Sequence, residues 1–138
     1  MTLLQIIETL KAIAITQPLI DTATDGDIYQ ALNGNTSVKY GVFHINQTTH
    51  QSTDTTDTYG LNLFFVDMLA EDESNRLQVQ SLGKTLIDNI VRVFCEQYDA
   101  DVATITYTPF TQRFNDMTAG VFATMNITTY KETSCAEL

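Results

Sequence analysis

Two neighbouring segments of the chain, residues 38–46 and 59–69, carry large apolar side chains at alternating and at adjacent positions. Side chains alternate between the two faces of a β-strand, so Val42 and Phe43 must point to opposite faces. A strand that is apolar on both faces needs cover on both sides. A helix is one candidate cover, and a neighbouring subunit is the other.

Helical and strand-like segments follow one another in the order helix, strand, strand, helix, strand, strand. Apolar residues recur at helical spacing over residues 3–15 and 74–98. Alternating segments cover residues 103–110 and 120–130, and Pro109 indicates that the first of these ends or lies at a sheet edge. This order predicts an α+β fold: an antiparallel sheet of four strands, or slightly more, with the two main helices on one face.

Local signals predict how the helices and turns begin and end. Ser74 or Asp72 is expected to cap the second long helix, because short polar side chains satisfy the free N–H groups of a first turn. One short helical turn is expected around Asp27 to Leu32, closed by Asn33 and Gly34.

The length of 138 residues predicts a single domain spanning residues 1–138, with a frayed tail at 131–138. Cys95 and Cys135 lack the spacing of a zinc site or of a disulfide framework, which favours a reducing compartment. The N-terminal segment has the pattern of an amphipathic helix rather than a signal peptide. No apolar run approaches the roughly 18 residues of a membrane span, so we expect no membrane partner.

The charge balance is strongly acidic, with 17 acidic against 7 basic residues and a formal net charge of −10. The basic residues are scattered singly, whereas gripping a nucleic-acid backbone needs clustered Lys and Arg. An acidic surface repels DNA, and that repulsion is useful where DNA must pass without sticking.

No catalytic or cofactor-binding pattern is present in the sequence. There is no GxSxG segment, no GxGxxG or GxxxxGK[ST] phosphate loop, and no HExxH or DxDxDG spacing. His50, Asp54 and Asp57 lie close in sequence, and a divalent-metal hydrolase that uses them is a competing hypothesis. Because these residues fall in a Thr-rich stretch rather than on a rigid scaffold, we expect no catalytic residue, no metal ligand, no cofactor and no enzymatic activity.

Two further segments have the composition of contact surfaces. Residues 46–60, NQTTHQSTDTTDTYG, hold six threonines and no large aliphatic residue, which is typical of an extended polar loop. Phe110 and Phe114 flank a turn that contains Gln112 and Arg113. Aromatic residues beside an Arg are common in protein interfaces, although a satellite core is the alternative.

Two longer segments resemble a family of phage proteins. The segment YGLNLFFVDMLAEDESNRLQVQSLGKTLIDNIVRVF is similar to the strand that leads into the long helix of tail-completion proteins, and FTQRFNDMTAGVFATMNI is similar to their F-x-D-x-x-A-G-x-x-A-x-x-x-I ending. The chain resembles tail-terminator-like neck proteins, including the ring proteins of crAss-like Bacteroides phages. The residues that carry this resemblance are Asp67, Glu71, Asp72, Asn75, Gln80, Gly83, Phe114, Asp116, Ala119 and Gly120.

The resemblance implies a structural virion protein, assembled in the bacterial host cytoplasm. It implies a sixfold or twelvefold homo-oligomeric ring in the head-tail connector, which joins portal, neck-ring or tail proteins. DNA passes through such a ring during ejection without being specifically bound. The alternative is a monomeric bacterial module that binds a small ligand or carbohydrate in a pocket lined by Tyr40, Tyr59 and Phe65.

In such rings, long hairpin loops reach into a neighbour, so we expect residues 47–58 to form an arm that is flexible in the free chain and ordered on assembly. Strand addition to a neighbour would offset the entropy lost on ordering. The alternative is a loose hairpin loop with no partner. The residues predicted to contact a neighbouring subunit or ring are Thr48, Thr49, His50, Asp54, Asp57, Tyr59, Phe110, Arg113, Phe114, Asn115 and Asp116.

Overall fold

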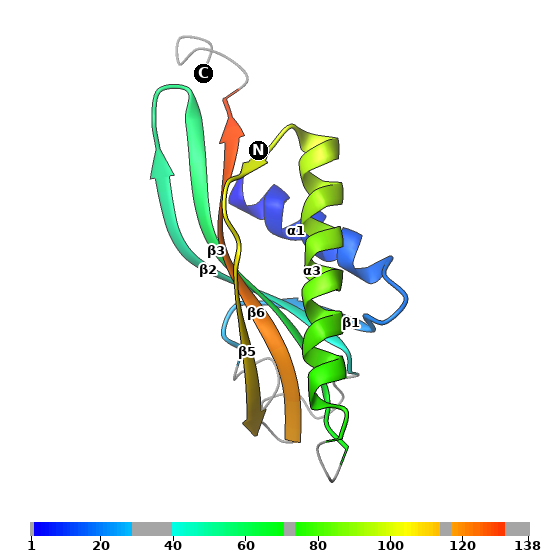
Figure 1. Ribbon diagram of the computed structural model, residues 1–138. Helices are drawn as coiled ribbons and strands as arrows, with labels where there is room; N and C mark the ends of the chain where they lie inside the picture. The colour runs from blue at the N-terminus through cyan, green and yellow to red at the C-terminus, as the bar shows by residue number, and fades with distance from the viewer. Residues whose placement is uncertain (1, 29–39, 71–73, 114–116, 132–138) are drawn as a thin grey trace.

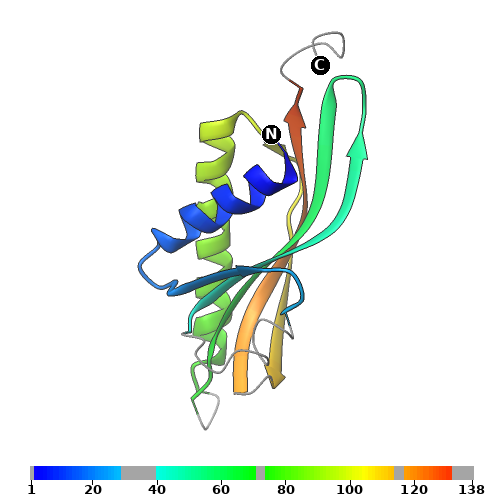
Figure 2. The same ribbon diagram turned by 180° about the vertical axis from the view of Figure 1, so that it is seen from behind.

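A computed structural model of the chain describes residues 2–28, 40–70, 74–113 and 117–131. It is an α+β structure in which both long helices lie on the same side of one sheet (Figures 1 and 2). The elements in chain order are α1 (Leu3–Ile15), β1 (Thr22–Asp25), β2 (Val42–Ser52), β3 (Thr56–Met68), α3 (Arg76–Tyr98), β4 (Asp101–Val102), β5 (Thr106–Arg113) and β6 (Met117–Tyr130). The predicted α+β class and the two helices are confirmed.

The sheet has six strands, in the order β1-β2-β3-β6-β4, and β5 also pairs with β6. Strands β2, β3, β6, β4 and β5 pair antiparallel, but β1 runs parallel to β2, from Thr22 opposite Val42 to Asp25 opposite Ile45. The prediction of an antiparallel sheet of four or slightly more strands is therefore confirmed in part: the sheet is mixed, because β1 is parallel. The segment TATD of β1 has four residues and no large apolar side chain, so it carries no strand signal of its own.

Strands β2 and β3 continue through the Thr-rich stretch that the sequence predicted to be a loop. Register pairs reach Ser52 opposite Asp57, with a bulge between Gln47 and Thr49, so only residues 53–55 separate the strands. Thr has a high β-propensity. Strand β6 also continues alongside, with Tyr130 opposite Thr56. The hairpin arm (residues 47–58) is thus a paired β-ribbon, and its mobility in the free chain stays a prediction.

The two helices begin in different ways. At α1 the Thr2 hydroxyl accepts from the Gln5 N–H at 3.2 Å and the Gln5 side chain accepts from the Thr2 N–H at 2.8 Å, a reciprocal cap. At α3 the residue before the first turn is Asn75, and its side chain makes no cap bond. Ser74, one of the two residues predicted to cap this helix, is therefore not at the cap position. Asp72 and most of the predicted helical turn at 27–32 lie outside the described residues.

Asn75 instead connects the end of β3 to the start of α3. Its side-chain oxygen accepts from the Ala70 N–H at 2.8 Å, and its amide nitrogen donates to the Met68 carbonyl at 3.1 Å. These bonds fix the short connection between the last residues of the strand and the first turn of the helix.

The main core lies between the sheet and the two helices. Strand residues such as Phe65, Leu63 and Ile127 are fully buried against helix residues such as Leu10 and Phe94. Gly83 allows α3 to approach the sheet, because a Cβ at this position would lie 2.7 Å from Val121 Cγ1 and 2.9 Å from Phe65 Cδ2.

The opposite face of the sheet is apolar over one end only. Val42 and Val66 are fully buried there, and Ile28, Tyr40, Phe64 and Phe110 pack against them. The two-sided apolar pattern is confirmed, but residues of the same chain supply much of the second cover. The expectation that this apolar face needs a neighbouring subunit therefore loses its main support.

Candidate interaction surface

The tip of the hairpin arm is held by hydrogen bonds from the residue that follows β6. The backbone N–H of Lys131 donates to the Thr55 carbonyl at 2.8 Å, and its ammonium donates to Ser52 Oγ at 2.9 Å and to the Thr53 carbonyl. The Thr53 N–H donates to the Thr56 carbonyl at 2.8 Å and closes the turn. Three strands are therefore bound together where the arm ends.

Near this tip, His50, Asp57 and Tyr59 form one cluster on the helix side of the arm. The His50 and Tyr59 rings stack with their centroids 4.4 Å apart, and His50 Nε2 lies 3.2 Å from Asp57 Oδ1. The hydrogen bond from Ser52, followed by that from His50, lowers the pKa of Asp57 below its usual value. Tyr59 is only 3% exposed, and burial raises its pKa. Tyr59 therefore attaches the arm to the core of its own chain.

The bulge places two predicted contact residues on the other side of the arm. A Cβ on Gly60 would meet the hydroxyls of Thr48 and Thr49 and would lie 3.2 Å from the Asn126 side-chain oxygen. Glycine at position 60 thus makes room for both threonines. Asp54, in the turn at the tip, is exposed.

The second predicted contact segment begins with Phe110, which is partly buried. Its ring lies 6.2 Å from that of Phe64 and 6.3 Å from that of Phe122, and Gln80 donates to its carbonyl at 3.0 Å. Phe110 therefore belongs to a satellite core, the alternative that the sequence left open. Arg113 ends β5. The predicted contact residues Phe114, Asn115 and Asp116 lie outside the described residues.

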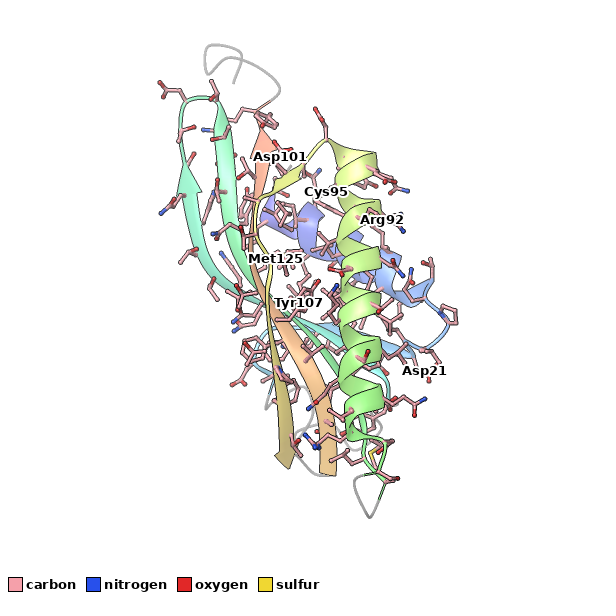
Figure 3. All side chains as sticks on the ribbon, in the orientation of Figure 1. Asp21, Arg92, Cys95, Asp101, Tyr107 and Met125 are labelled. Atoms are coloured by element: carbon pink, nitrogen blue, oxygen red, sulfur yellow. The ribbon has the colours of Figure 1, made fainter. Side chains whose placement is uncertain are left out.

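The sheet face that points away from the helices (the open face) is almost free of charge. Among the described strand residues that register assigns to this face, Asp101 is the only charged one, and it pairs with Thr128 at the sheet edge. Figure 3 shows Asp101 beside the end of β6. Strand register assigns to this face the polar residues Asn46, Thr48, Thr49, Gln51, Thr58, Asn62, Thr106, Thr108, Thr124, Asn126 and Thr128.

Some of these polar side chains already bond to one another. Thr124 donates to Asn62 Oδ1 at 3.0 Å, and the hydroxyls of Thr58 and Thr128 lie 3.1 Å apart. A polar group that is satisfied within its own chain loses less on contact with another surface than an unsatisfied one. The open face is thus polar, uncharged and partly self-bonded.

The two edges of the sheet differ. Strand β1 covers only the Val42–Ile45 portion of β2, so within the described residues the arm has no strand partner on its outer edge. The opposite edge is formed by β4 and β5 and contains Pro109, which confirms the predicted edge position. Proline lacks an N–H group and is one of the means by which edges resist further pairing. The outer edge of the arm carries no proline and no lysine.

His50 and Asp57 lie in contact, but within the described part of the chain this pair does not form part of a larger group of potential metal ligands. The described residues hold no group of three His, Cys, Asp or Glu side chains placed to bind a metal. Tyr40 packs against the far side of the sheet from Tyr59 and Phe65, so these three do not line one pocket. A groove of about 420 Å³ does lie between α1 and α3, lined by Glu8, Thr9, Ala12, Ile13, Thr16, Val93, Gln97 and Tyr98.

Tyr107 and Asp88 join the edge strand to α3. The Tyr107 hydroxyl donates to the Asp88 carboxylate, which also accepts from Lys84 at 2.5 Å. Figure 3 shows Tyr107 between the sheet and α3. Burial, with the Asp88 carboxylate second, raises the pKa of Tyr107 far above its usual value. The hydrogen bond between Tyr107 and Asp88 therefore holds β5 against α3. The raised pKa keeps the Tyr107 hydroxyl protonated.

Sequence reasoning missed two functional candidates, Lys131 and His44. Lys131 was assigned to a frayed tail, although a lone cation directly after a long strand was the available signal. His44 lies in a predicted strand, and no sequence signal indicated that β1 would cover it.

No family model matches this chain. A search of curated proteins finds no relative either. Within the described residues, no helix has the length and apolarity needed to cross a membrane.

Proposed function

We propose that this chain is a structural virion protein that assembles into a homo-oligomeric ring in the neck or tail of a phage, around the DNA channel. The hairpin arm and the open face are its contact surfaces. The observation that carries the proposal is the arm itself, a long β-ribbon held in place by contacts with β6. The outer edge of the arm has no strand partner within the described residues and lies beside a face that is almost free of charge.

The bracing of the arm supports a role in binding. Contacts from Lys131 and Tyr59 hold its strands before any partner arrives, so little ordering entropy remains to be lost on association. An open strand edge binds another extended strand through backbone hydrogen bonds. Natural proteins usually block such an edge with charges or proline, and this edge has neither.

The distribution of charge supports copies of the same chain as partners. Each copy carries a formal charge of −10, so acidic surfaces of two copies repel each other. Interface cores are depleted of charged residues, because a charge buried without a partner is costly. Away from Asp101 at its edge, the open face is a surface on which two acidic copies meet without burying a charged strand residue.

The genes that flank this one test the virion role. Portal, capsid or tail genes on both sides are expected, since neck and tail proteins are encoded together with the parts they join. A gene set for metabolism or sugar uptake on both sides would contradict the proposal and favour a ligand-binding module.

A further inference from the structure

His44 lies buried at the join between β1 and β2. Its side chain is fully inaccessible to solvent. Nε2 lies 2.8 Å from the Gly26 carbonyl oxygen, and Nδ1 lies 2.7 Å from Thr24 Oγ1. A carbonyl oxygen only accepts, so Nε2 carries the proton and Nδ1 accepts from the Thr24 hydroxyl. Both ring nitrogens are satisfied by the neutral form.

These two side-chain bonds add to the backbone pairing that attaches β1 to β2. The strand pairs with β2 over four residues, and the turn after it is held by the Gly26 N–H, which donates to the Ile45 carbonyl at 3.0 Å. On the helix side, Lys11 pairs with Asp25 at 2.8 Å. Such a short parallel strand has few hydrogen bonds of its own.

The charges around the ring do not remove the cost of protonating it. Asp25 and Asp27 act on the ring and favour the cation, while Lys11 neutralises Asp25. From β3, the Phe64 ring meets His44 edge-on at 5.8 Å and offers no charge. Burial outweighs the hydrogen bond to the Gly26 carbonyl and the two carboxylates, and lowers the pKa of His44 below 6.5.

We propose that His44 makes the attachment of β1 to β2 sensitive to acid, so that protonation of the buried ring releases β1 from the sheet. A second proton on the ring must sit on Nδ1, where it removes the acceptor of the Thr24 hydroxyl and leaves a cation in a closed site. Release of β1 extends the open edge of β2 from the arm back to Val42.

The direction of the pH dependence of β1 attachment follows from the lowered pKa of His44. Above pH 6.5 the ring is neutral in both the attached and the released state, so attachment does not depend on pH. Below pH 6.5 the released state takes up the proton first, and attachment weakens as the pH falls.

Hydrogen exchange of the backbone amides at pH 7.5 and pH 5.0, corrected for the intrinsic rate of exchange, tests this inference. In the wild-type chain we expect amides of residues 22–26 to exchange more than tenfold faster at pH 5.0. His44→Gln keeps a donor for Gly26 and does not titrate, so its protection should be equal at both pH values. The sequence has two histidines. His50→Gln is therefore the matched control and should keep the acid effect.

An NMR titration of the wild-type ring decides the case even if His44→Gln fails to fold. The His44 ring is expected to titrate below pH 6.5, at the pH where the β1 amides lose protection. Protected β1 amides at pH 5.0, or a His44 ring that titrates at or above pH 6.5, would overturn the inference. Neither outcome bears on the assembly of copies of the chain into an oligomer. The inference about His44 can therefore fail while the proposed function stands.

Discussion

The ammonium of Lys131 lies 2.9 Å from Ser52 Oγ and joins the end of β6 to the tip of the hairpin arm. The contact spans 79 positions of the chain. Pairing with β6 makes the arm part of a three-stranded sheet, whereas a two-stranded ribbon is marginally stable alone. The Lys131 contact adds to this pairing at the tip and contributes to the preorganisation of the arm.

Replacement of Lys131 by Met should loosen the arm without unfolding the core. Loss of a hydrogen bond of about 1 kcal/mol predicts roughly fivefold faster amide exchange over residues 50–56. Hydrogen exchange measured by mass spectrometry checks this, with Arg92→Met on the exposed side of α3 as control. Unchanged exchange in the arm would show that Lys131 does not brace it.

Replacement of Gly83 by Ala should destabilise the fold. Alanine favours a helix by about 1 kcal/mol, but the added Cβ would meet Val121 and Phe65 below 3 Å, and overpacking costs about 1–3 kcal/mol. We expect a net loss of about 1 kcal/mol in the free energy of unfolding, measured by urea denaturation. Ser81→Ala, on the exposed side of the same helix, should be neutral or slightly stabilising. A stabilised Gly83→Ala variant would show that the helix is not in close contact with the sheet.

Replacement of Tyr107 by Phe tests the contact between β5 and α3. The variant keeps the ring but leaves the Asp88 carboxylate without its hydroxyl donor, so about 1–2 kcal/mol of unfolding free energy should be lost. Tyr98→Phe provides the control, because Tyr98 is 43% exposed. Equal stability of the two variants, measured by thermal unfolding, would mean that the bond contributes nothing.

A charge placed on the open face should weaken self-association. Thr124 is exposed at the centre of this face, and Thr124→Glu would add a repulsive, poorly paired charge to any contact made there. We expect a drop of at least tenfold in the association constant, measured by sedimentation velocity. Gln78→Glu adds the same charge on the exposed surface of α3 and should leave association unchanged. Equal behaviour of the two variants would exclude the open face as an interface.

Several elements of the fold were predictable because their signals are local and periodic. Apolar spacing placed α1 at Leu3–Ile15, as observed, and period-two alternation over residues 120–130 predicted the strand β6, in which Val121 and Ile127 belong to the core. Pro109 marked an edge strand for a purely local reason, the missing N–H group.

Other elements were not predictable because tertiary contacts decide them. Strand β1 is stable only where β2 and α1 meet it, and the arm is a ribbon because β6 runs beside it from Tyr130. Tertiary contacts also made Phe110 part of a satellite core, one of two alternatives that the sequence left open, and buried Tyr59, which was predicted to be a contact residue.

Native mass spectrometry of the purified chain tests the central proposal most directly. The account predicts a single closed oligomer, of six or twelve copies, that dissociates when Thr124→Glu is combined with Gln51→Lys, which places a charge on the outer strand of the arm. A wild-type chain that stays monomeric at high concentration, alone and with its neck proteins present, would contradict it.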